Sequence, residues 1–402
     1  MDNANARERV ADWVSVEQLN TDPYPTYDRL RREGPVMWVP LMGRHLTASY
    51  DSAVGVEADP ELFTAWEPDG QSTMLRTMHG RPMNRKDDPE HMADRRVEVR
   101  PLKPAAIKRT WLQVFDDSAD RFLDELIDAG PDVNFMTHFA GPYAADILRR
   151  VIGFTNVDHS DVKRWSKNLC NGIGNVTDDP DIWARTERTN DEIDAAIAEH
   201  IPYYRDHADD TLLSAFLHSD LPMENLHANI KLTIAGGMNE PQNIVAAAIY
   251  GLLTHPQQLA LVNAGEYDYA AVFEETVRWM TPIGMFPRTV TRDTEYFGAR
   301  LYAGDKIAAL TGAANRDETV FENPAQFDLT RPHHPHFAFG SGTHICAGMW
   351  VSRAAVGKVA LPKIFRRLQG LAMSQEREPV VQGWVFHGLT DLPLTWTGVN
   401  GS

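Results

Sequence analysis

The chain has 402 residues, of which 43% are hydrophobic and 24% are charged, so it can bury a sizeable core. Its formal net charge of −17 argues against nucleic acid or an anionic membrane surface as a partner. Two cysteines, Cys170 and Cys346, do not imply a disulfide framework, and an unpaired thiol suits a reducing cytoplasm. The polar N-terminus has no signal-peptide pattern, and no stretch approaches the roughly 20 apolar residues that span a bilayer. We therefore expect a cytoplasmic protein.

The first hundred residues predict a helix, a hairpin and a loop. Residues 22–36 read as a short helix that a Gly-Pro pair ends, and residues 36–49 alternate loosely, like a small hairpin. Residues 63–86 lack periodicity and are predicted to be loop, although their methionines, Met74 among them, would suit a mouldable pocket wall.

Residues 87–96 open a helix that carries a candidate anion clamp. His91 and Arg95 are four residues apart and share one face, so both could reach one anionic ligand. Taken alone, the pair would be an ordinary solvated helix face. Further along, residues 170–175 predict a break in the helical pattern. The helices predicted by pattern before residue 220 are 111–129, 139–152, 161–169 and 191–204.

Residues 223–255 form the longest apolar-periodic stretch, and its middle is unusual. Gly236 and Gly237 are followed by Asn239, Glu240 and Pro241. A proline inside a helix removes the hydrogen bond to the carbonyl four residues back and kinks the axis, which would open a groove there. The alternative is two helices joined at the glycines, with Asn239 or Glu240 capping the second.

The C-terminal third predicts a helix over 273–279, a strand over 283–288 and a hairpin turn at 303–305. Glu275 and Arg278 sit three apart and can pair on their helix. A histidine cluster at 333–336 is interleaved with prolines, so a solvated loop is preferred there over a metal site. Residues 383–388 form a short turn between strands.

Residues 339–348, Phe-Gly-Ser-Gly-Thr-His-Ile-Cys-Ala-Gly, read as a tight loop, because glycine adopts unusual backbone conformations cheaply. Cys346 then precedes an apolar run of helical character, where the helix dipole and free N–H groups favour a thiolate. One cysteine cannot make a zinc or iron–sulfur site, whereas haem iron needs only one axial protein thiolate. The alternative is a glycine-rich turn with a buried structural cysteine.

This decapeptide resembles the haem-binding signature of the cytochrome P450 family, with every fixed position filled. The resemblance runs from about residue 22 to the C-terminus. It implies one mainly α domain with small β-sheets over 1–402, residues 1–21 forming an N-terminal arm, and haem b between the long central helix and the cysteine loop. Cys346 would be the axial iron ligand.

The resemblance also implies roles for other residues. Those expected at the haem propionates are His91, Arg95, Arg288 and His344. The haem loop would comprise Phe339, Gly340, Gly342 and Gly348, and a structural cluster would comprise Glu275, Arg278 and Arg331. The expected substrate pocket comprises Met74, Ile173, Thr233, Gly236, Gly237, Ile283, Met285, Phe286 and Phe386, with Phe386 favoured over Trp384 because alternate residues face opposite sides.

The sequence departs from the family where an acid–threonine pair is usual, since Asn239 and Glu240 stand there. A buried carboxyl with a raised pKa could relay protons in place of the threonine, or could only order a water. The Glu-Pro variant is similar to a bacterial subgroup that includes aromatic O-demethylases. We therefore expect a monooxygenase acting on a small apolar or aromatic, plausibly methoxylated, substrate. The alternatives are hydroxylation of another small molecule such as a terpene or natural-product intermediate, a peroxide-driven peroxygenase, and a non-enzymatic haem-thiolate sensor or gas carrier.

The resemblance implies O2 and electrons from NAD(P)H through a separate partner, a ferredoxin or a flavin/iron–sulfur reductase. A positive patch on an acidic protein would steer an acidic donor. The basic residues expected to contribute are Arg100, Lys103, Lys108, Arg109, Lys358, Arg366 and Arg367.

Overall fold

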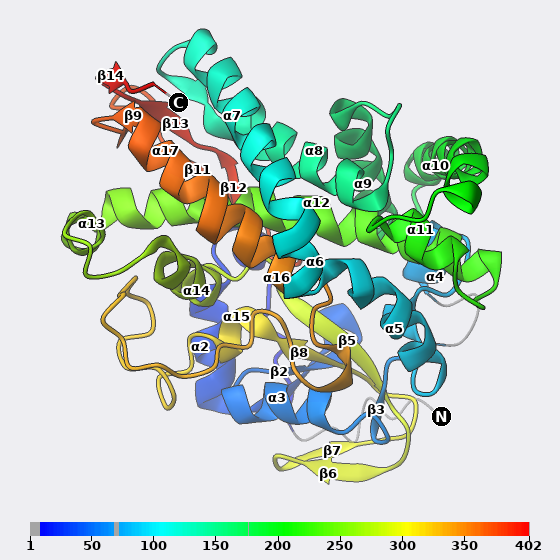
Figure 1. The fold of residues 1–402 in the computed structure, drawn as a ribbon. Helices are drawn as coiled ribbons and strands as arrows, with labels where there is room; N and C mark the ends of the chain where they lie inside the picture. Colours follow the sequence, from blue (N-terminus) through cyan, green and yellow to red (C-terminus); the bar gives the residue numbers. More distant parts are fainter. Residues whose placement is uncertain (1–8, 68–71, 176, 402) are drawn as a thin grey trace. The chain divides into compact units, whose positions relative to one another are not determined.

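The structure is a computed structural model that describes residues 9–67, 72–175 and 177–401. The fold is mainly helical with small β-sheets, as the sequence predicted (Figure 1). The described chain divides into two compact units, each drawn from separate segments. The first takes described residues from Met1–Trp66, Ala247–Cys346 and Pro379–Asp391, and the second from Glu67–Ala246, Ala347–Glu378 and Leu392–Ser402. Over the same described ranges, no helix is both long and apolar enough to cross a bilayer.

The first unit contains a mixed sheet with the strand order β1-β2-β8-β5-β3, of which β2, β8, β5 and β3 are labelled in Figure 1. β1 (Val36–Val39) and β2 (Arg44–Thr47) pair antiparallel, which confirms the predicted hairpin. β2 runs parallel to β8 (Lys306–Leu310), and β8 pairs antiparallel with β5 (Met285–Val290), which pairs with β3 (Phe63–Thr64).

Two apolar clusters use the alternating side chains of this sheet. Leu46 and Leu310 belong to one cluster, and Ile307 and Val290 belong to the other. Because successive strand side chains point to opposite faces, both faces of the sheet are buried. The first unit's other elements are α1 (Val16–Thr21), α2 (Tyr24–Glu33), η2 (Pro40–Met42), α3 (Tyr50–Ala58), α13 (Pro256–Asn263), α14 (Tyr269–Trp279), β6 (Thr294–Tyr296), β7 (Ala299–Leu301), α15 (Thr311–Ala314), η6 (Gly342–His344), β11 (Val380–Gln382) and β12 (Gly388–Asp391).

The second unit is largely helical and holds most of α12 (Met223–Thr254), whose last residues belong to the first unit. Among its other helices, α7 (Leu112–Ala129) is amphipathic and buries one face, whereas α8 (Gly141–Ile152) is buried except at Arg149 and Arg150. The second unit's remaining elements are α4 (Thr73–Met78), η3 (Met83–Arg85), α5 (Glu90–Leu102), α6 (Pro104–Ala106), η4 (Ile107–Trp111), β4 (Val133–Asn134), η5 (Met136–Ala140), α9 (His159–Ile173), α10 (Pro180–Asp206), α11 (Leu212–Leu217), α16 (Met349–Ser352), η7 (Arg353–Ala360), α17 (Leu361–Arg367), β9 (Leu368–Gln369), β10 (Ala372–Met373), β13 (Pro393–Thr395) and β14 (Gly398–Val399).

Three local predictions were wrong. The stretch 63–86, expected to be loop, contains β3, α4 and η3, while its residues 68–71 lie outside the described ranges. The break expected from residue 170 comes later, because α9 continues to Ile173. The turn at 303–305 joins strands of different sheets, and the hairpin of this region is formed instead by β6 and β7.

α12 is a single continuous helix with Pro241 inside it, so the alternative of two helices is also wrong. Figure 1 shows it as one long green helix. The apolar packing of its flanking turns outweighs the lost hydrogen bond at the proline, a cost of roughly 3 kcal/mol.

Candidate functional site

The cysteine loop adopts the backbone that its glycines predict. Gly340 and Gly342 have positive φ angles of 69° and 65°. A Cβ on Gly342 would also run into the backbone carbonyl of Glu57 at the end of α3, so only glycine fits there. The amide of Cys346 donates to the carbonyl of Phe339 over 2.9 Å, which closes the loop. The helical run predicted after the cysteine begins at Met349.

A buried ion cluster in the first unit brings together the three residues expected to be structural. Arg278 on α14 donates from Nε and Nη2 to the two carboxylate oxygens of Glu275, over 2.7 and 2.6 Å. Arg331 places Nε 3.5 Å from Glu275 Oε1. Bidentate arginine–carboxylate geometry is strong and directional. Arg278 also donates to the carbonyls of Asn315 and Pro324, so the cluster ties α14 to the segment that precedes the cysteine loop.

Arg288, expected at a propionate, makes a buried ion pair within the first unit. Its Nη2 lies 2.5 Å from Glu57 Oε2, and the two side chains are 6% and 2% exposed. The second expected propionate residue of this unit, His344, lies half-buried in η6.

The pocket residues expected from the first unit divide between two environments. Met285 and Phe286 are neighbours on β5 and pack against the two opposite apolar clusters of the sheet. Ile283 forms a β-bridge with Phe386 instead. Trp384 packs against the apolar cluster that contains Leu46, so it and Phe386 differ in their surroundings.

In the second unit, His91 and Arg95 lie on α5 with the predicted spacing. His91 is 1% exposed, and its Nδ1 lies 3.2 Å from Asp88 Oδ1. Burial lowers the pKa of His91 and outweighs the opposing effect of Asp88, so the imidazole is held neutral near pH 7. Arg95 is half-buried. Neither side chain is therefore fully exposed to solvent, as it would be on an ordinary solvated helix face.

Met74 and Ile173 are brought close by their elements. Thr73, next to Met74 on α4, donates from Oγ1 to the carbonyl of Ile173 over 2.6 Å. Met74 is 9% exposed, and Ile173 is half-buried at the end of α9. The hydrogen bond fastens α4 to α9 at Ile173, through the residue next to Met74.

The middle of α12 carries an unusual carboxyl group. Glu240 is half-buried, but its Oε2 is shut off from solvent and has no hydrogen-bond partner in the described part of the chain. Burial raises the pKa of Glu240 to about 8, so the group is mostly neutral at pH 7. Its neighbour Asn239 accepts a hydrogen bond from Gln242 Nε2 over 2.9 Å.

The two glycines of α12 have opposite surroundings. A Cβ on Gly237 would lie 2.9 Å from Leu148 Cδ1 on α8, whereas a Cβ on Gly236 would meet nothing within 4 Å. Gly236 is also exposed. One turn before it, Thr233 donates towards Glu98, a buried residue on α5 that sequence reasoning missed. The available signal was its position, because Glu98 follows His91 by seven residues and Arg95 by three, on the same helix face.

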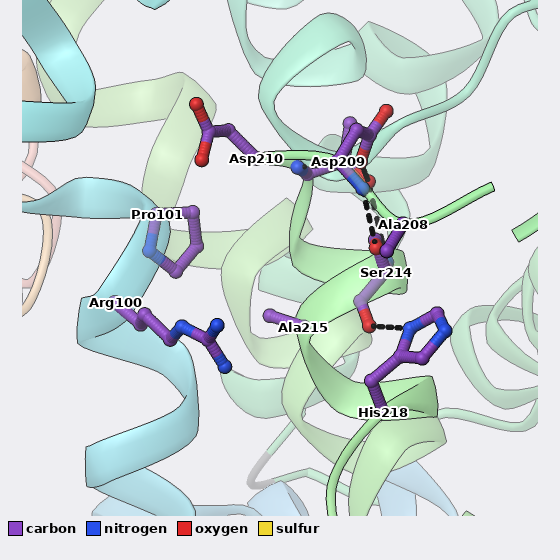
Figure 2. Close-up of a pocket in the computed structure, with 9 residues that line it drawn as sticks. Arg100, Pro101, Ala208, Asp209, Asp210, Ser214, Ala215 and His218 are labelled. Atoms are coloured by element: carbon purple, nitrogen blue, oxygen red, sulfur yellow. Dashed lines mark hydrogen bonds between the residues drawn. The ribbon is translucent and has the colours of Figure 1, made fainter. Parts of the chain in front are cut away.

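A separate small pocket lies in the second unit between the end of α5 and the start of α11 (Figure 2). Arg100, Asp209 and His218 contribute to its lining, and its volume is about 70 Å³. Small-molecule sites are usually roughly 300–1,000 Å³, and none of the residues predicted for the haem or the substrate lines this pocket. We do not assign the substrate to it.

Most of the basic residues expected to face an electron donor are exposed, but one is not. Arg367 is 5% exposed and donates to Asp124 Oδ1 over 2.7 Å, so its inclusion in the patch was wrong. Arg109 is exposed and paired with Asp210.

Comparison with known proteins identifies the family. A cytochrome P450 family model matches residues 269–393. Cytochrome P450-SOY of Streptomyces griseus is 30% identical over 77% of this chain and 74% of its own length. Nocardicin C N-oxygenase of Nocardia uniformis subsp. tsuyamanensis is 29% identical over 93% of this chain and 96% of its own length.

A solved structure shares the fold. P450BioI, crystallised with an acyl carrier protein ligated to hexadec-9Z-enoic acid, superposes with a TM-score of 0.86 at 23% identity, over 95% of this chain and 100% of that chain. The family binds haem and uses electrons derived from NAD(P)H, and one of the relatives named here is an N-oxygenase. The chain belongs to the cytochrome P450 family and is a monooxygenase.

Proposed function

We propose that this monooxygenase removes the methyl group from a small methoxylated aromatic compound. The observation that carries the proposal is the carboxyl of Glu240, placed next to Pro241 inside α12 with a buried, unpartnered oxygen. A neutral carboxyl in that position can hold a proton at Oε2 and give it up, which supports the role of a proton donor in place of the usual threonine.

The residues of the cysteine loop and of the expected propionate contacts fit haem b. The sulfur of Cys346 stands at the end of a glycine loop whose backbone leaves no room for a Cβ at Gly342. Cys346 would be the axial ligand, and His91, Arg95, Arg288 and His344 would hold the propionates. When bound, haem b with thiolate ligation supplies the oxidation of an unactivated C–H bond by O2.

The contribution of the chain is orientation and proton supply. Apolar side chains, with Phe386 and Met74 among them, would hold the ring and exclude water. Glu240 would supply protons from its neutral carboxyl and be reprotonated from solvent, with Asn239 positioned beside it.

The overall reaction balances as follows. One atom of O2 is inserted into a C–H bond of the methoxy carbon, and the other leaves as water, with the uptake of two electrons from NAD(P)H and two protons. The resulting hemiacetal breaks its C–O bond to the methyl carbon and releases formaldehyde and a phenol. A separate ferredoxin or flavin/iron–sulfur reductase would deliver the electrons.

The test is a spectral titration of the purified ferric protein with methoxylated aromatic rings, followed by turnover. A shift from low to high spin, with formaldehyde and phenol formed in equal amounts, is expected with NAD(P)H and a ferredoxin–reductase pair. Product with peroxide alone would assign a peroxygenase. A spin shift with a terpene or natural-product scaffold, and none with methoxylated rings, would assign hydroxylation of that class. Reversible ligand binding without turnover would assign a sensor.

A further inference from the structure

Glu98 is a second buried carboxyl group on the same unit as Glu240. It lies on α5, is 4% exposed, and accepts from Thr233 Oγ1 through Oε1 over 3.0 Å. Its other oxygen, Oε2, is buried without a hydrogen-bond partner among residues 9–67, 72–175 and 177–401. A buried carboxylate with one bare oxygen is costly, so the neutral acid is favoured.

The number of hydrogen-bond donors and acceptors around Thr233 supports a neutral Glu98. The Thr233 hydroxyl has one proton but two acceptors in reach, Glu98 Oε1 at 3.0 Å and the carbonyl of Asn229 at 2.9 Å. If Glu98 is protonated, it donates to Thr233, and Thr233 donates to Asn229. Burial raises the pKa of Glu98 to about 7, so the acid changes charge within the working pH range.

The charges around Glu98 do not compensate it fully. On its own helix Arg95 favours the carboxylate and Asp94 opposes it, while Asp94 is itself paired with Lys86 over 2.6 Å. Two of the helices packed against α5, α6 and α11, have no ionisable side chain. Arg85 of η3 lies 3.5 Å from Glu67.

Apart from Glu240, the acidic and basic side chains of α12 are paired or exposed. Its cation Lys231 pairs with Asp194 over 2.9 Å, and His227 pairs with the same carboxylate over 2.7 Å. Glu224, on the first turn, is exposed. Glu98 therefore has no ion pair among the described residues, and neither does Glu240.

Thr233, Gly236 and Glu240 lie on one face of α12. At about 100° per residue they fall within an arc of roughly 60°. The centre of that face is open, because a Cβ on Gly236 would meet nothing within 4 Å. The open space thus has Thr233, backed by Glu98, on one side and Glu240 on the other.

We propose that Glu98, acting through Thr233, and Glu240 make this face of α12 select neutral rings that donate a hydrogen bond, such as phenols, over carboxylates. The proton of Thr233 is engaged whether Glu98 is neutral or ionised, so Thr233 presents an acceptor only. A phenolic hydroxyl can satisfy that acceptor. A benzoate cannot, and it would bring a negative charge beside two carboxyl groups that form no ion pair among the described residues. Glu98 is a positioning residue. The choice of an aromatic ring rests on the proposed function.

The experiment compares a methoxyphenol with the methoxybenzoate of the same substitution, by titration of the ferric holoprotein. The phenol is expected to bind roughly tenfold or more tightly at about pH 6, and the ratio should widen at about pH 9, where Glu98 is ionised. Glu98→Gln keeps a donor to Thr233 but has no charge, so benzoate affinity should rise several-fold at high pH while phenol affinity is retained. Thr233→Val should weaken the phenol alone.

Two controls keep the result interpretable. Glu224→Gln removes an exposed carboxyl from the same helix and should change neither affinity. An infrared band of a protonated carboxyl that titrates near neutral pH, and that Glu98→Gln removes, would locate the charge change at Glu98.

Equal or tighter binding of the benzoate would overturn the inference and leave O-demethylation standing. If no methoxylated ring binds, the proposed function fails. The same titration is then made with an alcohol and the corresponding carboxylic acid from the class of compound that does bind. Preference for the acid in that pair would equally overturn the inference, and preference for the alcohol would support it.

Discussion

The guanidinium of Arg288 on β5 and the carboxylate of Glu57 on α3 form a buried ion pair at 2.5 Å. The two residues stand 231 positions apart in the sequence, so the pair closes the first unit over a long span. Removing one partner of a buried pair leaves an uncompensated charge, whose cost usually exceeds the value of the contact itself.

Glu57→Ala should therefore lower the free energy of unfolding by about 3–5 kcal/mol, measured by urea denaturation of the holoprotein. The matched control is Glu125→Gln, which breaks the exposed Arg121–Glu125 pair on α7 and should cost less than about 1 kcal/mol. Similar losses in both variants would show that the Arg288–Glu57 pair is not a special anchor of the unit.

Cys346→His should abolish the red-shifted ferrous–CO band, because an imidazole donates less electron density to iron than a thiolate does. Cys170→Ala should leave the band intact. Cys170 donates to the carbonyl of Ala235 over 3.5 Å, and burial raises its pKa to about 12, so it remains a neutral thiol. An unaltered band in the Cys346 variant would remove that residue as the iron ligand.

Glu240→Gln should lower the amount of product formed per NAD(P)H by roughly tenfold or more and release peroxide, because an amide cannot give up a proton. The pKa of Glu240 is raised to about 8, so its proton-bearing form prevails below that value and is lost as the pH rises through it. In the unmodified enzyme the amount of product per NAD(P)H should accordingly stay constant up to about pH 7.5 and then fall, whereas in the variant it should not change over this pH range. Unchanged coupling in the variant would leave Glu240 with no more than a water-ordering role.

The neighbouring glycines of α12 offer a matched pair of substitutions. Gly236→Ala should fold normally, and even gain up to about 1 kcal/mol of helix stability, but should weaken the substrate-induced spin shift by narrowing the open face. Gly237→Ala should cost about 1–3 kcal/mol, because the new Cβ presses on Leu148. If Gly236→Ala leaves the titration unchanged, the substrate does not use that face.

Sequence patterns predicted the elements whose signal is local. The helix over 112–129 and the hairpin of β1 and β2 follow from periodicity and from turn residues. The short helix α4 was missed because six residues are too few to show a helical period. Its cap is a local signal, since the side chain of Ser72 accepts a hydrogen bond from the backbone amide of Leu75. For α12 the sequence left open whether the helix runs through Pro241 or divides at the glycines, and the structure shows that it runs through the proline.

The parts of the site that lie in one contiguous motif could be predicted from the sequence, and the parts that distant segments build could not. The cysteine loop is a contiguous decapeptide, so its glycines and its thiol were readable from the sequence. The partners of Arg288 and Thr233 were not, because Glu57 and Glu98 come from distant segments and only the folded chain brings them within hydrogen-bond range.

Glu57 serves two distant segments at once, since its carboxylate pairs with Arg288 and its carbonyl lies against Gly342. During translation at 5–20 residues per second, Glu57 would leave the ribosome roughly 10 to 50 s before Arg288 is made. For that interval α3 carries a charge without its partner, and the cysteine loop that packs against the end of α3 is synthesised later still. The nascent first unit should therefore depend on chaperones until the synthesis of its C-terminal segments is complete.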